Sequence, residues 1–180
     1  MAKFQNERIG ILGGSFDPAH KGHLIISKIA LKQAKLKKIY WIVTKKNPFK
    51  KKTFFSLKER LMQSKKIVKN FKNIQVLYLD DIINSSRSID IIRFIKKEKN
   101  VKDLYFIVGS DILLKFHKWK SWKRIVKLVK LIVFYRKGYD KKSRESIVVK
   151  YLNKDKIIFI KNKPIQISSS NLRKKILNKI

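Results

Sequence analysis

The residues best suited to chemistry in this sequence lie near its start, between Gly13 and His23. Gly13 and Gly14 follow a short apolar run, and glycines at that point let backbone N–H groups approach an anion closely. His20 and His23 are three residues apart, so a helical turn places both imidazoles on one side. They could donate hydrogen bonds to phosphate oxygens. A turn without a ligand, or a pair of surface histidines, would also explain the pattern.

Zinc binding by the two histidines is disfavoured, because the chain has no Cys and no suitably spaced third donor. We therefore expect no metal site built from protein side chains. Two of only three histidines in the chain nevertheless fall in one predicted turn. That concentration favours a functional interpretation over a chance pair.

A second polar group, Ser168, Ser169 and Ser170, lies near the other end of the sequence and is followed by Arg173. Serines are good helix N-caps, and capping alone could explain them. The hydroxyl groups, the helix N-terminus and Arg173 one turn further on could instead form a second anion-binding site. The sequence thus offers two possible phosphate-binding segments, at opposite ends of the chain.

Strand-like and helix-like segments alternate between these two groups. Apolar and β-branched runs predict strands at Arg8–Leu12, Ile39–Thr44, Ile74–Leu79, Leu104–Val108, Leu131–Tyr135 and Ile157–Ile160. Helical spacing and capping residues predict helices at His23–Ala34, Leu57–Lys69, Ser88–Lys97, Asp111–Val129 (in pieces), Ser143–Tyr151 and after Ser168. This order predicts a single α/β domain over residues 1–180, a Rossmann-like, doubly wound parallel sheet with helices on both faces. Ligands bind such sheets at the carboxyl ends of the strands.

The segment GGSFDPAHKGH, Gly13 to His23, resembles the N-terminal signature of the nucleotidyltransferase superfamily, whose hallmark is His-x-Gly-His. The segment ISSSNLR, Ile167 to Arg173, is similar to the C-terminal ATP-binding motif of the same superfamily. The resemblance implies that His20, His23 and Arg173 bind the ATP triphosphate and stabilise charge as pyrophosphate leaves. The implied ATP site consists of Gly13, Gly14, Ser15, Phe16, His20, His23, Ile167, Ser168, Ser169, Ser170 and Arg173.

Gly109, Asp111 and Trp119 resemble the Gly-x-Asp…Trp stretch of bacterial nicotinate-nucleotide adenylyltransferases. The resemblance implies that Asp111 hydrogen-bonds the mononucleotide and that Trp119 stacks on its pyridine ring, as a flat aromatic face allows. From the residues alone, Asp111 could equally be a carboxylate at a helix start. Trp119 could equally be a packing aromatic that pairs with Trp122.

Two further segments match this family less completely. Asn47 and Lys50 fall in its basic loop, where Phe49 replaces the usual His. Ser86 and Ser88 fall where the family carries Ser-Tyr-Thr before a helix, and the middle Tyr is replaced here. The resemblance implies that these two segments, together with Gly109, Asp111 and Trp119, bind the mononucleotide.

The implied enzyme transfers AMP from ATP to nicotinate mononucleotide, which gives deamido-NAD and pyrophosphate in NAD biosynthesis. Mg²⁺ is the expected cofactor, bound mainly through the ATP phosphates, because this ion commonly keeps its waters and contacts substrate phosphates. A pantetheine-phosphate adenylyltransferase or another nucleotidyltransferase is the alternative within the same chemistry. Pantetheine-phosphate adenylyltransferases usually carry Thr at the position of His20 and lack the Gly-x-Asp…Trp segment.

The charge of the chain raises an alternative from a different class. Forty-six Lys and Arg against 12 Asp and Glu give a net charge of +34, which could indicate a basic RNA- or DNA-binding domain. The lysines are spread along the whole chain instead of gathering with Arg and aromatics on one element. This spread favours solvated surface lysines, and we expect no specific nucleic-acid partner.

The hydrophobic content, the absence of Cys and the length of the apolar runs indicate which class of protein this is. A 44% hydrophobic content indicates a folded chain, and the absence of Cys excludes disulfides. The N-terminal residues lack an apolar signal-peptide core, and no apolar run approaches the roughly 20 residues of a membrane span. We expect a cytoplasmic enzyme whose partners are ATP and nicotinate mononucleotide, without membrane association.

Overall fold

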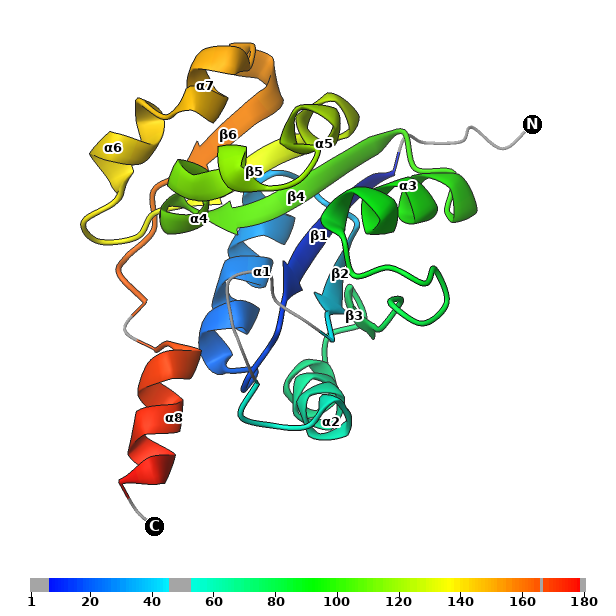
Figure 1. Ribbon diagram of the computed structural model, residues 1–180, viewed down its shortest axis with the longest axis vertical. Helices are drawn as coiled ribbons and strands as arrows, with labels where there is room; N and C mark the ends of the chain where they lie inside the picture. Colours follow the sequence, from blue (N-terminus) through cyan, green and yellow to red (C-terminus); the bar gives the residue numbers. More distant parts are fainter. Residues whose placement is uncertain (1–6, 46–52, 166, 179–180) are drawn as a thin grey trace.

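A parallel β-sheet with helices on both faces forms the framework of the protein (Figure 1). The computed structural model describes residues 7–45, 53–165 and 167–178, and in these ranges six strands pair in the order β3-β2-β1-β4-β5-β6. The strands are β1 (Arg8–Gly14), β2 (Lys38–Val43), β3 (Ile74–Leu77), β4 (Asp103–Gly109), β5 (Lys130–Phe134) and β6 (Ile157–Ile160). Every neighbouring pair is parallel.

The order of the strands reverses between β1 and β4, since the chain adds β2 and β3 on one side and β5 and β6 on the other. Right-handed crossovers therefore place the helices of the two halves on opposite faces of the sheet. A crevice opens at such a reversal, at the carboxyl ends of the two central strands. The predicted Rossmann-like, doubly wound fold is confirmed.

The helices fall into two groups by the core that they cover. The helices are α1 (Lys21–Gln33), α2 (Leu57–Val68), α3 (Ser88–Glu98), α4 (Ser110–Lys115), α5 (Trp122–Leu128), α6 (Asp140–Arg144), α7 (Ile147–Tyr151) and α8 (Ser169–Leu177). Short 3₁₀ turns follow α4 (Phe116–Lys118) and α7 (Lys154–Lys156). Helices α1 and α2 contribute to the core on one face, and α3, α4, α5 and α7 to the core on the other. Helix α8 projects from the body (Figure 1).

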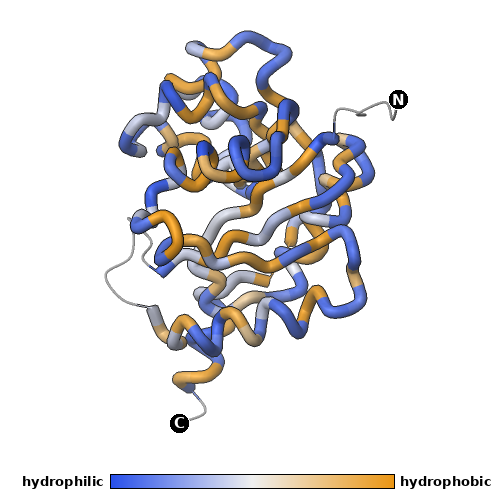
Figure 2. The backbone as a smooth tube through the Cα atoms, turned by 90° about the vertical axis from the view of Figure 1, so that its right-hand side faces the viewer, coloured by the Kyte–Doolittle hydropathy of each residue, from blue (hydrophilic) through white to orange (hydrophobic). Residues whose placement is uncertain are grey.

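The strands are buried on both faces, as near-continuous apolar runs predict. All five residues from Ile39 to Val43 in β2 are buried. Hydrophobic residues gather in the strands and recur along the helices between hydrophilic ones (Figure 2). No helix in the described part of the chain is long and apolar enough to cross a membrane.

Local sequence signals explain several boundaries. The capping box of α2 is present as predicted: Ser56 accepts from the Glu59 N–H at 3.3 Å, and Glu59 accepts from the Ser56 N–H at 2.8 Å. Strand β1 is longer than predicted, because Gly13 and Gly14 still pair with β2. The predicted helix at Ser143–Tyr151 was wrong in extent, since α6 ends at Arg144 and α7 begins at Ile147.

Candidate active site

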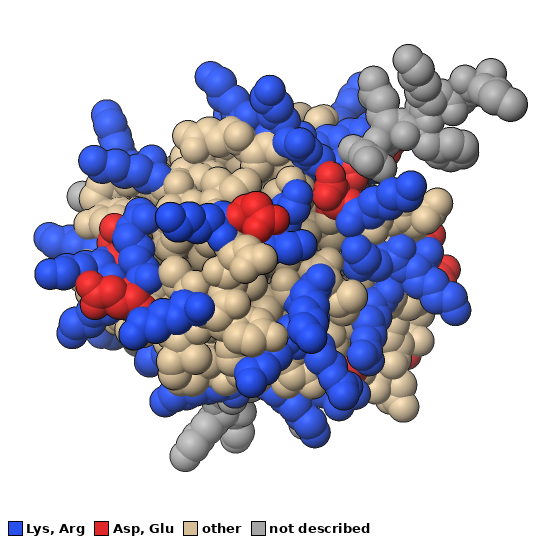
Figure 3. Space-filling view, turned by 90° about the horizontal axis from the view of Figure 1, so that it is seen from above, with Lys and Arg blue, Asp and Glu red and all other residues tan. Residues whose placement is uncertain are grey.

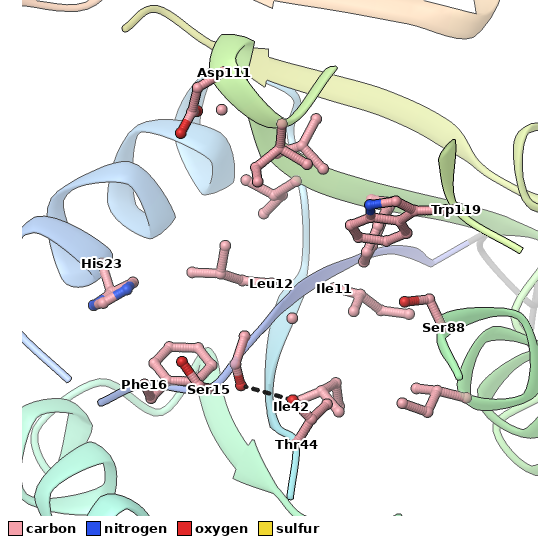
Figure 4. A pocket seen from close by; sticks show the side chains of 18 of the residues that line it. Ile11, Leu12, Ser15, Phe16, His23, Ile42, Thr44, Ser88, Asp111 and Trp119 are labelled. Atoms are coloured by element: carbon pink, nitrogen blue, oxygen red, sulfur yellow. Dashed lines mark hydrogen bonds between the residues drawn. The ribbon is translucent and has the colours of Figure 1, made fainter. Parts of the chain in front are cut away.

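A cavity of about 880 Å³ opens at the carboxyl ends of β1 and β4, where the strand order reverses. Its wall includes fourteen of the predicted site residues: Gly13, Gly14, Ser15, Phe16, His20, His23, Ser86, Ser88, Gly109, Asp111, Trp119, Ser168, Ser169 and Ser170. Asp111 and Trp119 lie across the cavity from His23 and Phe16 (Figure 4). The fold thus brings the predicted ATP-binding and mononucleotide-binding segments to one place.

Two predicted residues of the described chain are not part of this wall, and two others cannot be placed. Ile167 and Arg173 belong to the described chain but do not line the cavity. Asn47 and Lys50 lie outside the described residues.

The two histidines are fixed by the start of α1. His20 is its N-cap, and Nδ1 of His20 accepts from the Gly22 N–H at 3.1 Å. Nδ1 of His23 accepts from the His20 N–H at 3.2 Å. Because each Nδ1 accepts, the neutral form of each ring carries its proton on Nε2 and can donate from that atom. The ring centroids are 3.8 Å apart, so the two imidazoles are in direct contact.

Burial controls the charge of His20. The side chain of His20 is only 8% exposed, and burial together with the Arg136 charge lowers its pKa to about 4. His20 is therefore neutral near pH 7 and offers a dipole rather than a positive charge. A neutral imidazole N–H can bind a phosphate oxygen without requiring a second buried charge.

The turn between β1 and α1 has an unusual backbone at Phe16. Its φ is 46°, in the left-handed region that non-glycine residues seldom adopt. The Phe16 ring stacks on Trp41 with a centroid distance of 5.1 Å, and Trp41 Nε1 donates to Ser27 at 2.8 Å. Core packing thus anchors the conformation of the turn.

The closing segment contacts this turn directly. Ser169 Oγ donates to the Pro18 carbonyl at 2.9 Å, and Arg173 Nη1 donates to the Asp17 carbonyl. The Arg173 guanidinium also lies 3.6 Å from the Asp17 carboxylate. Ser168 caps α8 by accepting from the Asn171 N–H at 3.2 Å. The opening and closing motifs therefore meet beside the histidines, as their pairing predicts.

The opposite wall combines a carboxylate with aromatic rings. Asp111, in the first turn of α4, lies 3.8 Å from Arg136 Nε. Trp119 stacks on Phe116 with a centroid distance of 4.7 Å and meets Phe106 edge-on. Trp119 is thus packed on the core and also lines the cavity, and its stacking on a pyridine ring stays a prediction.

Sequence reasoning missed Asp17, Arg60 and Arg136. Arg136 follows β5, lines the cavity and donates its backbone N–H to Ser110 Oγ at 2.9 Å. Its place after a strand could have revealed it, because the carboxyl ends of parallel strands share one edge. Asp17 and Arg60 are 1% exposed, and their partners are distant in sequence, so no local pattern identifies them.

Comparison with known proteins identifies the family. Residues 11–175 match the family model described as cytidylyltransferase-like. A Pelagibacter ubique protein, described as a probable nicotinate-nucleotide adenylyltransferase, is 47% identical over 167 residues, 93% of this chain and 92% of the relative. The chain belongs to the nicotinate-nucleotide adenylyltransferases. A Mesorhizobium japonicum protein of this family is 34% identical over 143 residues, 79% of this chain and 73% of the relative.

Solved structures agree on the fold of this family. A Plasmodium falciparum nicotinic acid mononucleotide adenylyltransferase, complexed with NaAD, aligns with a TM-score of 0.76 at 22% identity. The alignment covers 93% of this chain and 83% of the other. The identity to the relatives places the chain in the nicotinate-nucleotide branch of the family.

Proposed function

We propose that this chain transfers the AMP part of ATP to the 5′-phosphate of nicotinate mononucleotide and releases pyrophosphate, with deamido-NAD as the product. The observation that carries the proposal is the convergence of the opening and closing segments on one cavity. Ser169 and Arg173 bond to the turn that precedes the two histidines. The opposite wall presents Asp111 and Trp119, which suit a nucleotide with a flat heterocycle.

The proposed reaction needs no protein nucleophile. It needs the two substrates to be positioned and the charge on the leaving pyrophosphate to be stabilised. A phosphate oxygen of the mononucleotide attacks the α-phosphorus of ATP in line, and the bond between that phosphorus and the bridging oxygen to the β-phosphate breaks. Negative charge develops on the pyrophosphate. The Nε2 donors of His20 and His23 are oriented by the hydrogen bonds that each Nδ1 accepts, and they stabilise this charge.

Arg173 and the serines of α8 would bind the polyphosphate from the other side. Arg173 contacts Asp17 in the structure, and Ser168, Ser169 and Ser170 line the cavity. Asn47 and Lys50 remain proposed contacts of the mononucleotide. Gly109, Ser86 and Ser88 belong to its proposed site through their place in the wall.

Mg²⁺ is proposed as the cofactor and would neutralise phosphate charge when bound. In the described part of the chain no three His, Asp or Glu residues come together as a possible metal cage. We propose that the ATP phosphates supply most of the ligands of this ion and that the protein contacts it little.

Steady-state pyrophosphate release tests the function. ATP is paired in turn with nicotinate mononucleotide, nicotinamide mononucleotide and phosphopantetheine. We expect the highest kcat/KM with nicotinate mononucleotide. A higher value with phosphopantetheine, or no turnover with any of the three, would overturn the proposal.

A further inference from the structure

Arg60 in α2 is a buried cation that the proposed mechanism does not use. Its side chain is 1% exposed, although arginine is rarely buried without partners. Burial lowers the pKa of Arg60, while the nearby Asp17 and Asp80 carboxylates raise it. A charge buried at this cost needs a structural or functional reason.

The guanidinium joins the ends of two neighbouring strands. Arg60 Nη1 donates to the Ser15 carbonyl at 2.7 Å and to the Thr44 carbonyl at 2.8 Å. Ser15 directly follows β1, and Thr44 directly follows β2, the strand paired with it. Both residues line the cavity, so Arg60 fixes part of its floor from the side of α2.

The Ser15–Phe16 peptide unit has a direct consequence for the cavity. This peptide is trans, and a trans peptide points its C=O and its N–H in opposite directions. Since Arg60 holds the Ser15 carbonyl towards α2, the Phe16 N–H points away from α2. Within the described part of the chain, this N–H donates to no acceptor. Ser15 and Phe16 line the cavity, with the Phe16 side chain near Ser15 in Figure 4.

Two buried carboxylates, Asp17 and Asp80, lie near the guanidinium and stabilise its positive charge. Asp17 accepts from the Phe54 and Phe55 N–H groups at 3.0 and 2.9 Å, and is 1% exposed. Asp80 accepts from the Lys45 N–H at 2.8 Å and is 6% exposed. Backbone N–H groups anchor both carboxylates, so the negative charge near Arg60 is fixed in position. The Phe16 backbone, with its φ of 46°, would otherwise have more favourable conformations available.

We propose that Arg60 is a positioning residue for ATP: it holds the Ser15 carbonyl and so aims the Phe16 N–H at a phosphate group of the bound nucleotide. The inference rests on the proposed function in one respect, which is that the bound nucleotide is ATP. An amide aimed in advance loses no free energy in reorientation when the phosphate binds. Arg60 then contributes to affinity for ATP without touching it.

Substitution of Arg60 gives the first test. Arg60→Met keeps an unbranched, buriable side chain but leaves the Ser15 carbonyl without its donor. Lys58→Met removes an exposed charge from the same helix and is the matched control. Calorimetric titration of each variant with one ligand at a time, so that no transfer occurs, gives the Kd for ATP and the Kd for nicotinate mononucleotide. We expect Arg60→Met to weaken ATP binding about tenfold or more and nicotinate mononucleotide about twofold at most.

The other variants sharpen this result. Arg60→Lys should recover part of the ATP affinity, and Lys58→Met should match the wild type. ATP affinity that is unchanged in a folded Arg60→Met, or equal losses for both ligands, would overturn the inference. These are binding measurements, so a failure of the proposed transfer reaction would appear separately, as ATP binding without turnover.

If the Arg60 variants do not fold, a measurement on the wild-type protein tests whether the Phe16 N–H binds a phosphate group. The ¹H–¹⁵N resonance of the Phe16 amide is followed while tripolyphosphate or ATP is added, and then while nicotinate mononucleotide is added. Hydrogen bonding to a phosphate oxygen should move the Phe16 proton downfield with both polyphosphates. A Phe16 amide proton that does not move downfield with ATP or tripolyphosphate would contradict the inference.

Discussion

At the scale of single residues, His20 shows how local bonding sets the chemistry of the cavity. Its Nδ1 accepts from the Gly22 N–H, so this nitrogen cannot bind a proton without losing the cap of α1. Burial acts in the same direction and lowers the pKa of His20 from 6.5 to about 4. The folded protein therefore binds fewer protons at this site than the unfolded chain between these two pH values.

This difference predicts a stability that depends on pH. The contribution of neutral His20 is fully present above about pH 6.5 and is lost as the pH falls towards about 4. His20→Asn keeps an N-cap acceptor but does not titrate. Urea unfolding at pH 7 and pH 4.5 should show a loss on acidification that is smaller in the variant, by on the order of 2 kcal/mol. Equal losses in both proteins would argue against a buried neutral His20.

His23 gives the second prediction at this scale. His23→Ala removes one aimed donor, so kcat for the proposed reaction should fall by about 10²- to 10³-fold. Far-ultraviolet circular dichroism should stay unchanged, because α1 keeps its N-cap His20. His117→Gln, which changes the histidine outside the cavity wall, is the matched control and should keep wild-type turnover. Loss of kcat in the control alone would refute the role of His23.

At the scale of elements, the sequence predicted those helices and strands whose boundaries are marked by residues close together in the chain. The Ser56–Glu59 capping box predicted the start of α2, and apolar runs predicted all six strands of the described sheet. The break between α6 and α7 was missed, because no Gly or Pro interrupts Ser143–Tyr151. Arg60 was missed for a related reason. Its bonds join residues 45 and 16 positions away, which only the assembled sheet brings together.

Helix α8 supports a prediction at the same scale. It has no buried residue, and the bonds Ser169–Pro18 and Arg173–Asp17 hold its first turns against the body. In Arg173→Met, the α8 amides should exchange with deuterium about tenfold faster, because local opening needs less free energy. Added ATP should slow this exchange in the wild type and less so in the variant. Lys174→Met, exposed on the same helix, should exchange like the wild type.

At the scale of the whole molecule, the net charge of +34 acts on stability and on substrate capture in opposite ways. Lys and Arg side chains are spread over the face seen in Figure 3, between areas of uncharged residues, and acidic groups are few there. Like charges so close together repel one another and destabilise the compact state, whereas their joint field attracts anionic nucleotides to the cavity. Salt weakens both effects, since the screening length falls from about 30 Å at 0.01 M to about 8 Å at 0.15 M.

Raising NaCl from 0.01 to 0.15 M should therefore increase Tm and decrease kcat/KM for ATP. The first change follows from screened repulsion and the second from weaker steering of an anion. Differential scanning calorimetry and initial rates measure the two quantities on the same samples. Sucrose at matched osmolality adds no ions and is the control for effects that do not depend on charge. A kcat/KM that rises or stays constant with salt would show that this excess of lysine does not assist nucleotide capture.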